Sequence, residues 1–214
     1  MTRHRSARLA AALIAIPVLL AACGGSATPT AAPSTPCPTS QPAALTADDV
    51  RNVTIKTDKG DIVVEIKGSL SPIATGNFVA LAECGYYDGV VFHRIVPGFV
   101  IQGGDGLYGR SPNVVPSQVG TGGPPYTIQD EPVTATYGRA VVAMARTAAP
   151  NSVGSQFFIV LTDEAREPLE SANTYQIIGT VTSGMEAVDA IAAAADQEIP
   201  TNPVPMNSVT VATP

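Results

Sequence analysis

The chain has 214 residues and a formal net charge of −6, which suits one globular domain with appendages. The charges are scattered, and no cluster of Lys and Arg indicates a nucleic-acid partner. Only two His residues and no Cys-x-x-Cys spacing are present, so we expect neither a metal site nor another cofactor.

Residues 1–22 form a predicted secretory signal peptide. Arg3, Arg5 and Arg8 supply a positive start, and Leu9 to Leu20 form an apolar core shorter than the ~20 residues of a spanning helix. The junction at Cys23 resembles a bacterial lipobox, in which the cysteine receives acyl chains such as palmitate. We therefore expect an exported protein, lipid-anchored to the extracytoplasmic face of the bacterial cell membrane. The alternative is an ordinary signal peptide with a chance cysteine.

Residues 23–47 are rich in Ser, Thr, Pro, Ala and Gln and carry almost no charge. Such a composition cannot bury a core and predicts a disordered tether. With Cys23 assigned to lipid, Cys37 and Cys84 remain as an even pair in an oxidising compartment, which predicts a disulfide. Two unrelated thiols are the alternative. Because the tether should make few other contacts, this bond should add little to stability.

The domain begins with a predicted β-hairpin, since apolar and polar residues alternate over 53–57 and 62–66. A helix should follow, with Ser71 as N-cap and Pro72 as its first residue, and end near Cys84.

A second hairpin is predicted at residues 92–103 around a Pro97-Gly98 turn. Regular alternation would place Phe92 and Arg94 on one face and His93 on the other. A long Gly/Pro-rich loop follows. Further strands are predicted at 139–145, 156–161, 175–181 and 208–212, with a second helix at 184–195. Many short strands and two helices indicate a mainly β protein built as an antiparallel barrel.

The second hairpin also carries a family signature. Residues 92–105 match F-H-R-x-x-P-G-F-x-x-Q-G-G-D, the hallmark of the cyclophilins, at every fixed position. Residues 138–145 and 150–159 resemble a second block of that family, and 120–123 a third. The resemblance covers residues 48–214. It implies a closed eight-stranded antiparallel β-barrel capped by two α-helices.

The resemblance implies a peptidyl-prolyl cis-trans isomerase that acts on X–Pro bonds in exported polypeptides. Its partners would be proline-containing peptides and exported unfolded proteins, and we expect a monomer. The enzyme would bind the twisted amide, with Arg94 donating to the prolyl nitrogen. The implied catalytic residues are Arg94, Phe99 and Gln102. The implied substrate-binding residues are Val100, Ala145, Arg146, Gln156, Phe158, Leu169 and Tyr175.

Five positions depart from the residues common in the family. Val100 stands in place of methionine, Ala143 of serine, Arg146 of asparagine and Tyr175 of histidine. Pro168 stands near the position of a tryptophan whose indole grips cyclosporin. These departures leave open an alternative function, a proline-peptide-binding or chaperone-like module with weak isomerase activity.

Two weaker signals have structural interpretations. Asp130 and Glu131 are adjacent, so strand geometry would point them to opposite faces, and a structural ion pair is expected rather than an acid/base site. His93 has no evident catalytic partner and should be a buried, hydrogen-bonded core residue.

Overall fold

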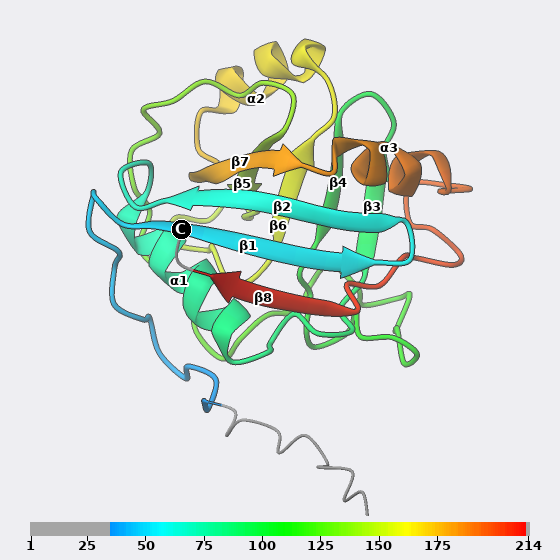
Figure 1. Ribbon diagram of the computed structural model, residues 1–214, viewed down its shortest axis with the longest axis horizontal. Coiled ribbons are helices and arrows are strands. Elements are labelled where there is room, and N and C mark those ends of the chain that lie inside the picture. Colours follow the sequence, from blue (N-terminus) through cyan, green and yellow to red (C-terminus); the bar gives the residue numbers. More distant parts are fainter. Residues whose placement is uncertain (1–34, 213–214) are drawn as a thin grey trace, which may run out of the picture. The chain divides into compact units, whose positions relative to one another are not determined.

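Residues 35–212, which the computed structural model describes, form one curled sheet of antiparallel strands with helices packed against it (Figure 1). Every strand pairing in the sheet is antiparallel. The strands are β1 (Val50–Thr57), β2 (Gly60–Lys67), β3 (Phe92–Val96), β4 (Val100–Gly103), β5 (Val141–Met144), β6 (Phe157–Val160), β7 (Ile177–Ser183) and β8 (Ser208–Ala212).

The strand ladder does not close into a barrel. The order is β3-β4-β6-β5-β7-β2-β1-β8, so β3 and β8 are edges. The segment before β8 occupies the free edge of β3: the amide of Phe92 donates to the carbonyl of Val204 at 3.0 Å, and that of Ile95 to Glu198 at 2.7 Å. The expected eight antiparallel strands are present. The predicted closed barrel is not confirmed, because this irregular segment, and not β8, forms the hydrogen bonds along the free edge of β3.

Within residues 35–212, three α-helices accompany the sheet, whereas the sequence predicted two. They are α1 (Pro72–Glu83), α2 (Arg166–Ala172) and α3 (Met185–Ala193), with a 3-10 turn at Asp163–Ala165 before α2. Figure 1 shows α1 and α3 at opposite ends of the strands. Helix α2 was not predicted from the sequence. It tolerates Pro168 in its first turn, because amides there need no partner within the helix.

Helix α1 begins at Pro72 with Ser71 at the N-cap position, as predicted, but the Ser71 side chain forms no capping hydrogen bond. The Ser71 hydroxyl is buried without a hydrogen-bond partner among residues 35–212. The Glu131 carboxylate instead accepts hydrogen bonds from the amides of Ile73 and Ala74, both at 2.9 Å. A carboxylate at this end satisfies free amides and interacts favourably with the helix dipole. Glu131 is therefore a cap for α1, and it forms no ion pair with any residue in the range 35–212.

Buried apolar side chains form one cluster on each face of the sheet. The inner face builds the main core, where four aromatic rings meet with centroids 5.1 to 6.2 Å apart: Phe78, Tyr87, Phe92 and Phe157. A second cluster lies on the outer face, between the sheet and α2. Its buried members are Val100, Tyr137, Ala143, Phe158, Val160, Ala165, Leu169 and Ile177.

Strand β3 contains a bulge at His93. Phe92 pairs with Gly103 and Arg94 with Gln102, which leaves His93 as the extra residue. The bulge places Phe92 in the core and Arg94 on the other face, so the predicted regular alternation is wrong here. His93 is buried as predicted. However, neither of its ring nitrogens has a hydrogen-bond partner within the described range, 35–212.

The N-terminal segment (residues 35–47) lies against the domain, whereas its composition predicted a tether. The amide of Leu45 donates to Pro72 at 3.0 Å, and the amide of Gln129 to the Gln41 side chain at 3.0 Å. Gly76 of α1 allows this approach, since a Cβ there would lie 2.2 Å from the carbonyl oxygen of Ala43. Many small contacts thus order this half of the predicted tether.

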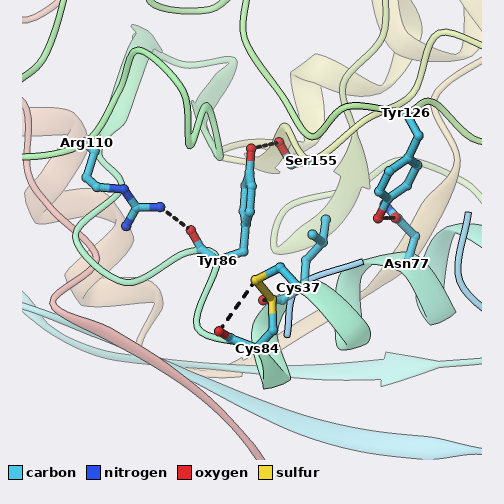
Figure 2. Close-up of a disulfide and its surroundings, with 8 residues drawn as sticks. Cys37, Asn77, Cys84, Tyr86, Arg110, Tyr126 and Ser155 are labelled. Carbon is cyan, nitrogen blue, oxygen red and sulfur yellow. Dashed lines mark hydrogen bonds between the residues drawn. A yellow bond between two sulfur atoms is a disulfide. The ribbon is translucent and has the colours of Figure 1, made fainter. Parts of the chain in front are cut away.

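The predicted disulfide between Cys37 and Cys84 is present, with the Cα atoms 5.1 Å apart (Figure 2). It joins the N-terminal segment to the end of α1. The signal peptide and Cys23 lie outside the described residues. Within 35–212, no helix is both long and apolar enough to cross a membrane.

Replacing both cysteines, Cys37→Ser with Cys84→Ser, should lower the free energy of unfolding by ~2–4 kcal/mol, because the crosslinked loop is ordered on folding. This exceeds the small effect expected from the sequence, since the N-terminal segment packs on the domain. Denaturant unfolding of the oxidised protein and the double variant measures the difference. Coincident midpoints with equal slopes would show that the segment's other contacts suffice.

The folding stability should depend on pH through His93. Burial lowers the pKa of its imidazole, with Asp105 opposing and Arg94 adding to that shift. Below pH ~6.5, His93 therefore binds a proton in the unfolded chain but stays neutral in the folded protein. The free energy of unfolding consequently falls as the pH decreases. In His93→Gln, this part of the decrease between about pH 6.5 and 5 should vanish. Parallel stability–pH curves for the two proteins would contradict the prediction.

Candidate active site

One residue from each of four neighbouring strands forms a row on the outer face. Arg94 of β3 is opposite Gln102 of β4, which is opposite Phe158 of β6, which is opposite Ala143 of β5. Alternation sends the next row into the core: Ile95, Ile101, Ile159 and Val142. The strand register thus brings together on one surface residues that are 49 positions apart along the chain, Arg94 and Ala143.

A hollow of about 210 Å³ lies over this row. It contains all the predicted catalytic and substrate-binding residues except Gln156. Part of its lining is apolar, and there the side chains of Val100, Phe158 and Leu169 are almost completely buried. The lining residues are Arg94, Phe99, Val100, Gln102, Ala145, Arg146, Phe158, Leu169 and Tyr175.

Gln102 and Gln156 connect the hollow to the long loop after β4. The Gln102 side-chain amide donates to the Gln156 carbonyl oxygen at 2.9 Å. Gln156 in turn donates to the backbone carbonyls of Gly120 and Gly122, both at 2.9 Å. Both carboxamides are therefore fixed in orientation, and Gln102 keeps its oxygen directed toward Arg94.

Arg94 is held from two sides at the edge of the hollow. Its Nε donates to Glu198 Oε1 at 2.7 Å, and its Nη1 to Gln102 Oε1 at a long 3.5 Å. No hydrogen bond of Nη2 is found within residues 35–212. Glu198 was not identified from the sequence, because nothing marks a lone carboxylate more than a hundred positions away as a neighbour of Arg94.

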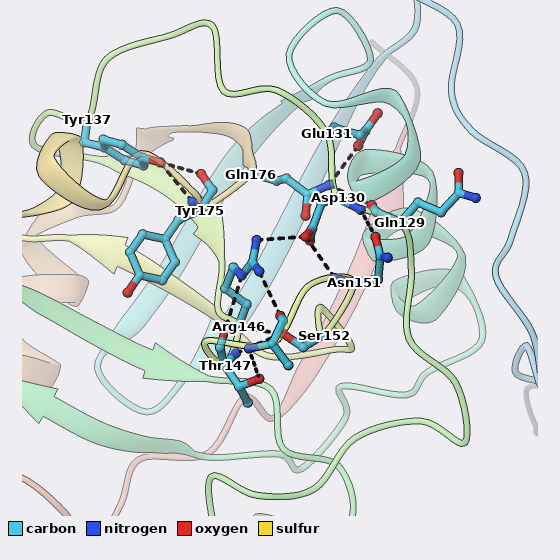
Figure 3. A network of polar contacts seen from close by, with 11 residues as sticks. Gln129, Asp130, Glu131, Tyr137, Arg146, Thr147, Asn151, Ser152, Tyr175 and Gln176 are labelled. Carbon is cyan, nitrogen blue, oxygen red and sulfur yellow. Dashed lines mark hydrogen bonds and ion pairs between the residues drawn. The ribbon is translucent and has the colours of Figure 1, made fainter.

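Arg146 lines the hollow, but its guanidinium is bound to its own loop and to Asp130 (Figure 3). It forms an ion pair with Asp130 at 3.0 Å and donates to the carbonyls of Thr147 and Ala149 at 3.1 and 2.8 Å. Its side chain is only 10% exposed. The Asp130 carboxylate also accepts the amide of Asn151 at 2.8 Å. The ion pair expected in this region thus belongs to Asp130 and Arg146, and it braces one wall.

Tyr137, which sequence reasoning missed, positions Tyr175. Its hydroxyl donates to the Tyr175 carbonyl at 2.7 Å and accepts the Tyr175 amide at 3.1 Å. Burial raises the pKa of Tyr137 to about 12, so the hydroxyl keeps its proton at neutral pH. The Tyr175 ring then packs edge-on against Phe158, with centroids 5.4 Å apart. An aromatic residue within an otherwise featureless loop was the only available sequence signal.

A second hollow, of about 380 Å³, adjoins the first and shares Gln102, Ala145 and Arg146 with it. Gln156, the predicted residue missing from the first hollow, lines this one. Pro168 lines neither; it lies exposed on α2, while its neighbour Leu169 faces inward.

The two hollows combine the guanidinium groups of Arg94 and Arg146, two oriented carboxamides and a set of apolar side chains. This arrangement can hold a ring in the apolar part and hydrogen-bond the polypeptide on either side of it. Among residues 35–212, no three His, Cys, Asp or Glu side chains gather as a group that could hold a metal ion.

Comparisons with known proteins agree on one family. Residues 52–211 match the sequence model described as cyclophilin type peptidyl-prolyl cis-trans isomerase/CLD. A probable peptidyl-prolyl cis-trans isomerase of Brucella abortus is 38% identical over 157 residues, covering 72% of this chain and 78% of that protein. A peptidyl-prolyl cis-trans isomerase of Acinetobacter baylyi is 34% identical over 168 residues, covering 74% and 84%.

Solved structures give the same result. A cyclophilin type peptidyl-prolyl cis-trans isomerase of Cryptosporidium parvum superposes with a TM-score of 0.63 at 28% identity, covering 77% of this chain and 99% of that one. A second structure of it, in the presence of the dipeptide Ala-Pro, gives a TM-score of 0.62 at 29% identity, covering 76% and 99%. Every residue of both hollows lies within the segment matched by the family model, and the chain belongs to the cyclophilin-type peptidyl-prolyl cis-trans isomerase family.

Proposed function

We propose that this isomerase binds the twisted X–Pro amide in the 210 Å³ hollow, with Arg94 donating a hydrogen bond to the prolyl nitrogen. The observation that carries the proposal is the position of Arg94. Its guanidinium lies at the rim of a hollow that Val100, Phe158 and Leu169 help to line, and Glu198 and Gln102 hold it there. Its Nη2 has no hydrogen-bond partner within residues 35–212.

The chemistry requires no covalent bond to the substrate. Amide resonance sets a barrier of ~18–20 kcal/mol to rotation about the X–Pro bond. In the twisted state, the prolyl nitrogen becomes pyramidal and gains a lone pair that neither planar isomer offers. A donor aimed at this nitrogen stabilises only the transition state, which is what raises the rate. A charge-assisted hydrogen bond of ~1.5–3 kcal/mol gives one or two factors of ten.

The apolar walls should supply the remaining stabilisation by holding the proline ring. Phe99, Phe158 and Leu169 line one part of the hollow. Burial of the proline ring against these side chains would hold the ring in place, so that the X side of the bond rotates. The Cryptosporidium parvum relative has been solved in the presence of Ala-Pro, which is consistent with a proline-sized pocket in this fold. The adjoining hollow beside Gln156 would take residues next to the proline.

The substrates would be exported unfolded proteins, with the enzyme anchored outside the cytoplasm by lipid on Cys23. Two features support this location. The first 22 residues have the pattern of a signal peptide that ends at a lipobox-like cysteine. The disulfide between Cys37 and Cys84 is also typical of an oxidising compartment.

Arg94→Ala should reduce kcat/KM for an X–Pro peptide by at least about tenfold, since one charge-assisted donor is lost. The fold should persist, because the side chain is partly exposed. A protease-free isomerisation assay, with circular dichroism as the folding check, measures this. Phe99→Leu is the contrast variant and should mainly weaken peptide binding. A folded Arg94→Ala protein with undiminished activity would eliminate Arg94 as the donor.

Cys23→Ala should release the protein from membranes or leave its signal peptide uncleaved, since no cysteine would remain to carry acyl chains. Membrane fractionation and intact mass of the product expressed in its native type of cell test this. Wild-type protein that lacks acyl mass and is wholly soluble would refute lipid anchoring, while leaving the isomerase mechanism untouched.

A further inference from the structure

Glu198, from a distant part of the chain, forms an ion pair with Arg94 of the candidate active site. Glu198 Oε1 accepts a hydrogen bond from Arg94 Nε at 2.7 Å, and the two side chains are 59% and 38% exposed. Glu198 itself does not line either hollow at the site. It therefore reaches Arg94 from outside, on the side away from the space that the peptide would occupy.

The backbone fixes where Glu198 stands. Its carbonyl accepts the amide of Ile95, the residue directly after Arg94, at 2.7 Å. Two residues farther along the chain, Pro200 is buried. The amide of Thr201 donates to the Asp196 side chain at 3.0 Å and closes a turn around Glu198. Glu198 thus sits on a braced turn alongside β3 rather than on a freely moving loop.

The ion pair of Arg94 and Glu198 contributes little to the stability of the whole domain. Ion pairs between exposed side chains contribute little, because water and salt screen them and ordering two long side chains costs entropy. The same ordering matters locally, however. An arginine at the edge of a hollow has many rotamers, and only those that direct its planar fork inward can reach a bound amide.

The hydrogen bonds of the Arg94 guanidinium show which of its N–H groups remain available for a bound peptide. Glu198 takes Nε, and Gln102 lies 3.5 Å from Nη1. A contact at Nε fixes the plane of the guanidinium and leaves the Nη edge for another acceptor. A carboxylate at this position also partly offsets the positive charge of Arg94, but solvent screening at an exposed pair makes that loss small.

We propose that Glu198 is a positioning residue, which holds Arg94 by Nε so that its Nη edge faces the X–Pro amide. This inference rests on the proposed role of Arg94 as the donor. It predicts that the contact matters in the transition state more than in the bound ground state, so that its loss lowers kcat more than it raises KM.

The experiment is a double-mutant cycle on the full chain, measured with an X–Pro peptide. Glu198→Ala should lower kcat/KM about three- to tenfold, chiefly through kcat, as expected for the loss of one hydrogen bond. Glu198→Gln keeps an acceptor and should retain at least half of the activity. In the Arg94→Ala background, Glu198→Ala should have no further effect. Glu83→Ala, which removes an exposed carboxylate from α1, is the charge-matched control and should match wild type.

A direct readout of the contact is the Arg94 Nε–H signal in nitrogen-15 NMR. It should be protected from solvent exchange in the wild type and in Glu198→Gln, and exchange rapidly in Glu198→Ala. The assignment follows from its absence in Arg94→Ala. A merely structural role for Glu198 would not link this signal to kcat.

The outcomes separate the two levels of the proposal. If Arg94→Ala is impaired but Glu198→Ala equals or exceeds wild type, the positioning role is overturned while the proposed function stands. The same holds if Glu198→Ala has equal effects with and without Arg94. If Arg94→Ala itself is fully active, the proposed function fails first.

Discussion

The register of four strands is the constraint on which the candidate active site depends. Arg94, Gln102, Phe158 and Ala143 occupy one row across β3, β4, β6 and β5, and the neighbouring row of Ile and Val side chains fills the core. A slip of one residue in any pairing would exchange the two rows. The apolar core therefore enforces the site: burying Ile95, Ile101 and Ile159 leaves the guanidinium and the carboxamide no face but the outer one.

Much of this arrangement could be predicted from the sequence, because its signals are local. Two apolar runs and the Pro97-Gly98 turn between them predicted the hairpin of β3 and β4, and Pro72 correctly marked the start of α1. The bulge at His93 could not be predicted in the same way. Its cause is the pairing of Phe92 with Gly103 and of Arg94 with Gln102, and a pairing between strands leaves no trace in the periodicity of either strand.

The parts that the sequence did not predict are held by contacts between distant residues. Helix α2 is short and lacks a side-chain cap, so its stability comes from placing Leu169 in the outer cluster. The Tyr137 hydroxyl holds the backbone of Tyr175, which is 38 positions away. The Glu131 carboxylate caps α1 through backbone amides at least 57 positions away. The N-terminal segment has the composition of a tether, yet a disulfide and the absence of a side chain at Gly76 let it lie on α1.

The open edge of the sheet connects the fold to the chemistry. A closed barrel would pair β3 with β8 along its length and place a regular strand beside Arg94. Here the segment before β8 crosses that edge irregularly, bonding to Phe92 and Ile95 while turning around Pro200 in between. Covering an exposed edge with a loop protects it from pairing with other chains. The same irregularity lets Glu198 project toward Arg94, which a strand in regular pairing would direct either into the core or straight out to solvent. The feature that keeps the sheet open is thus the one that brings a carboxylate within hydrogen-bonding distance of the arginine.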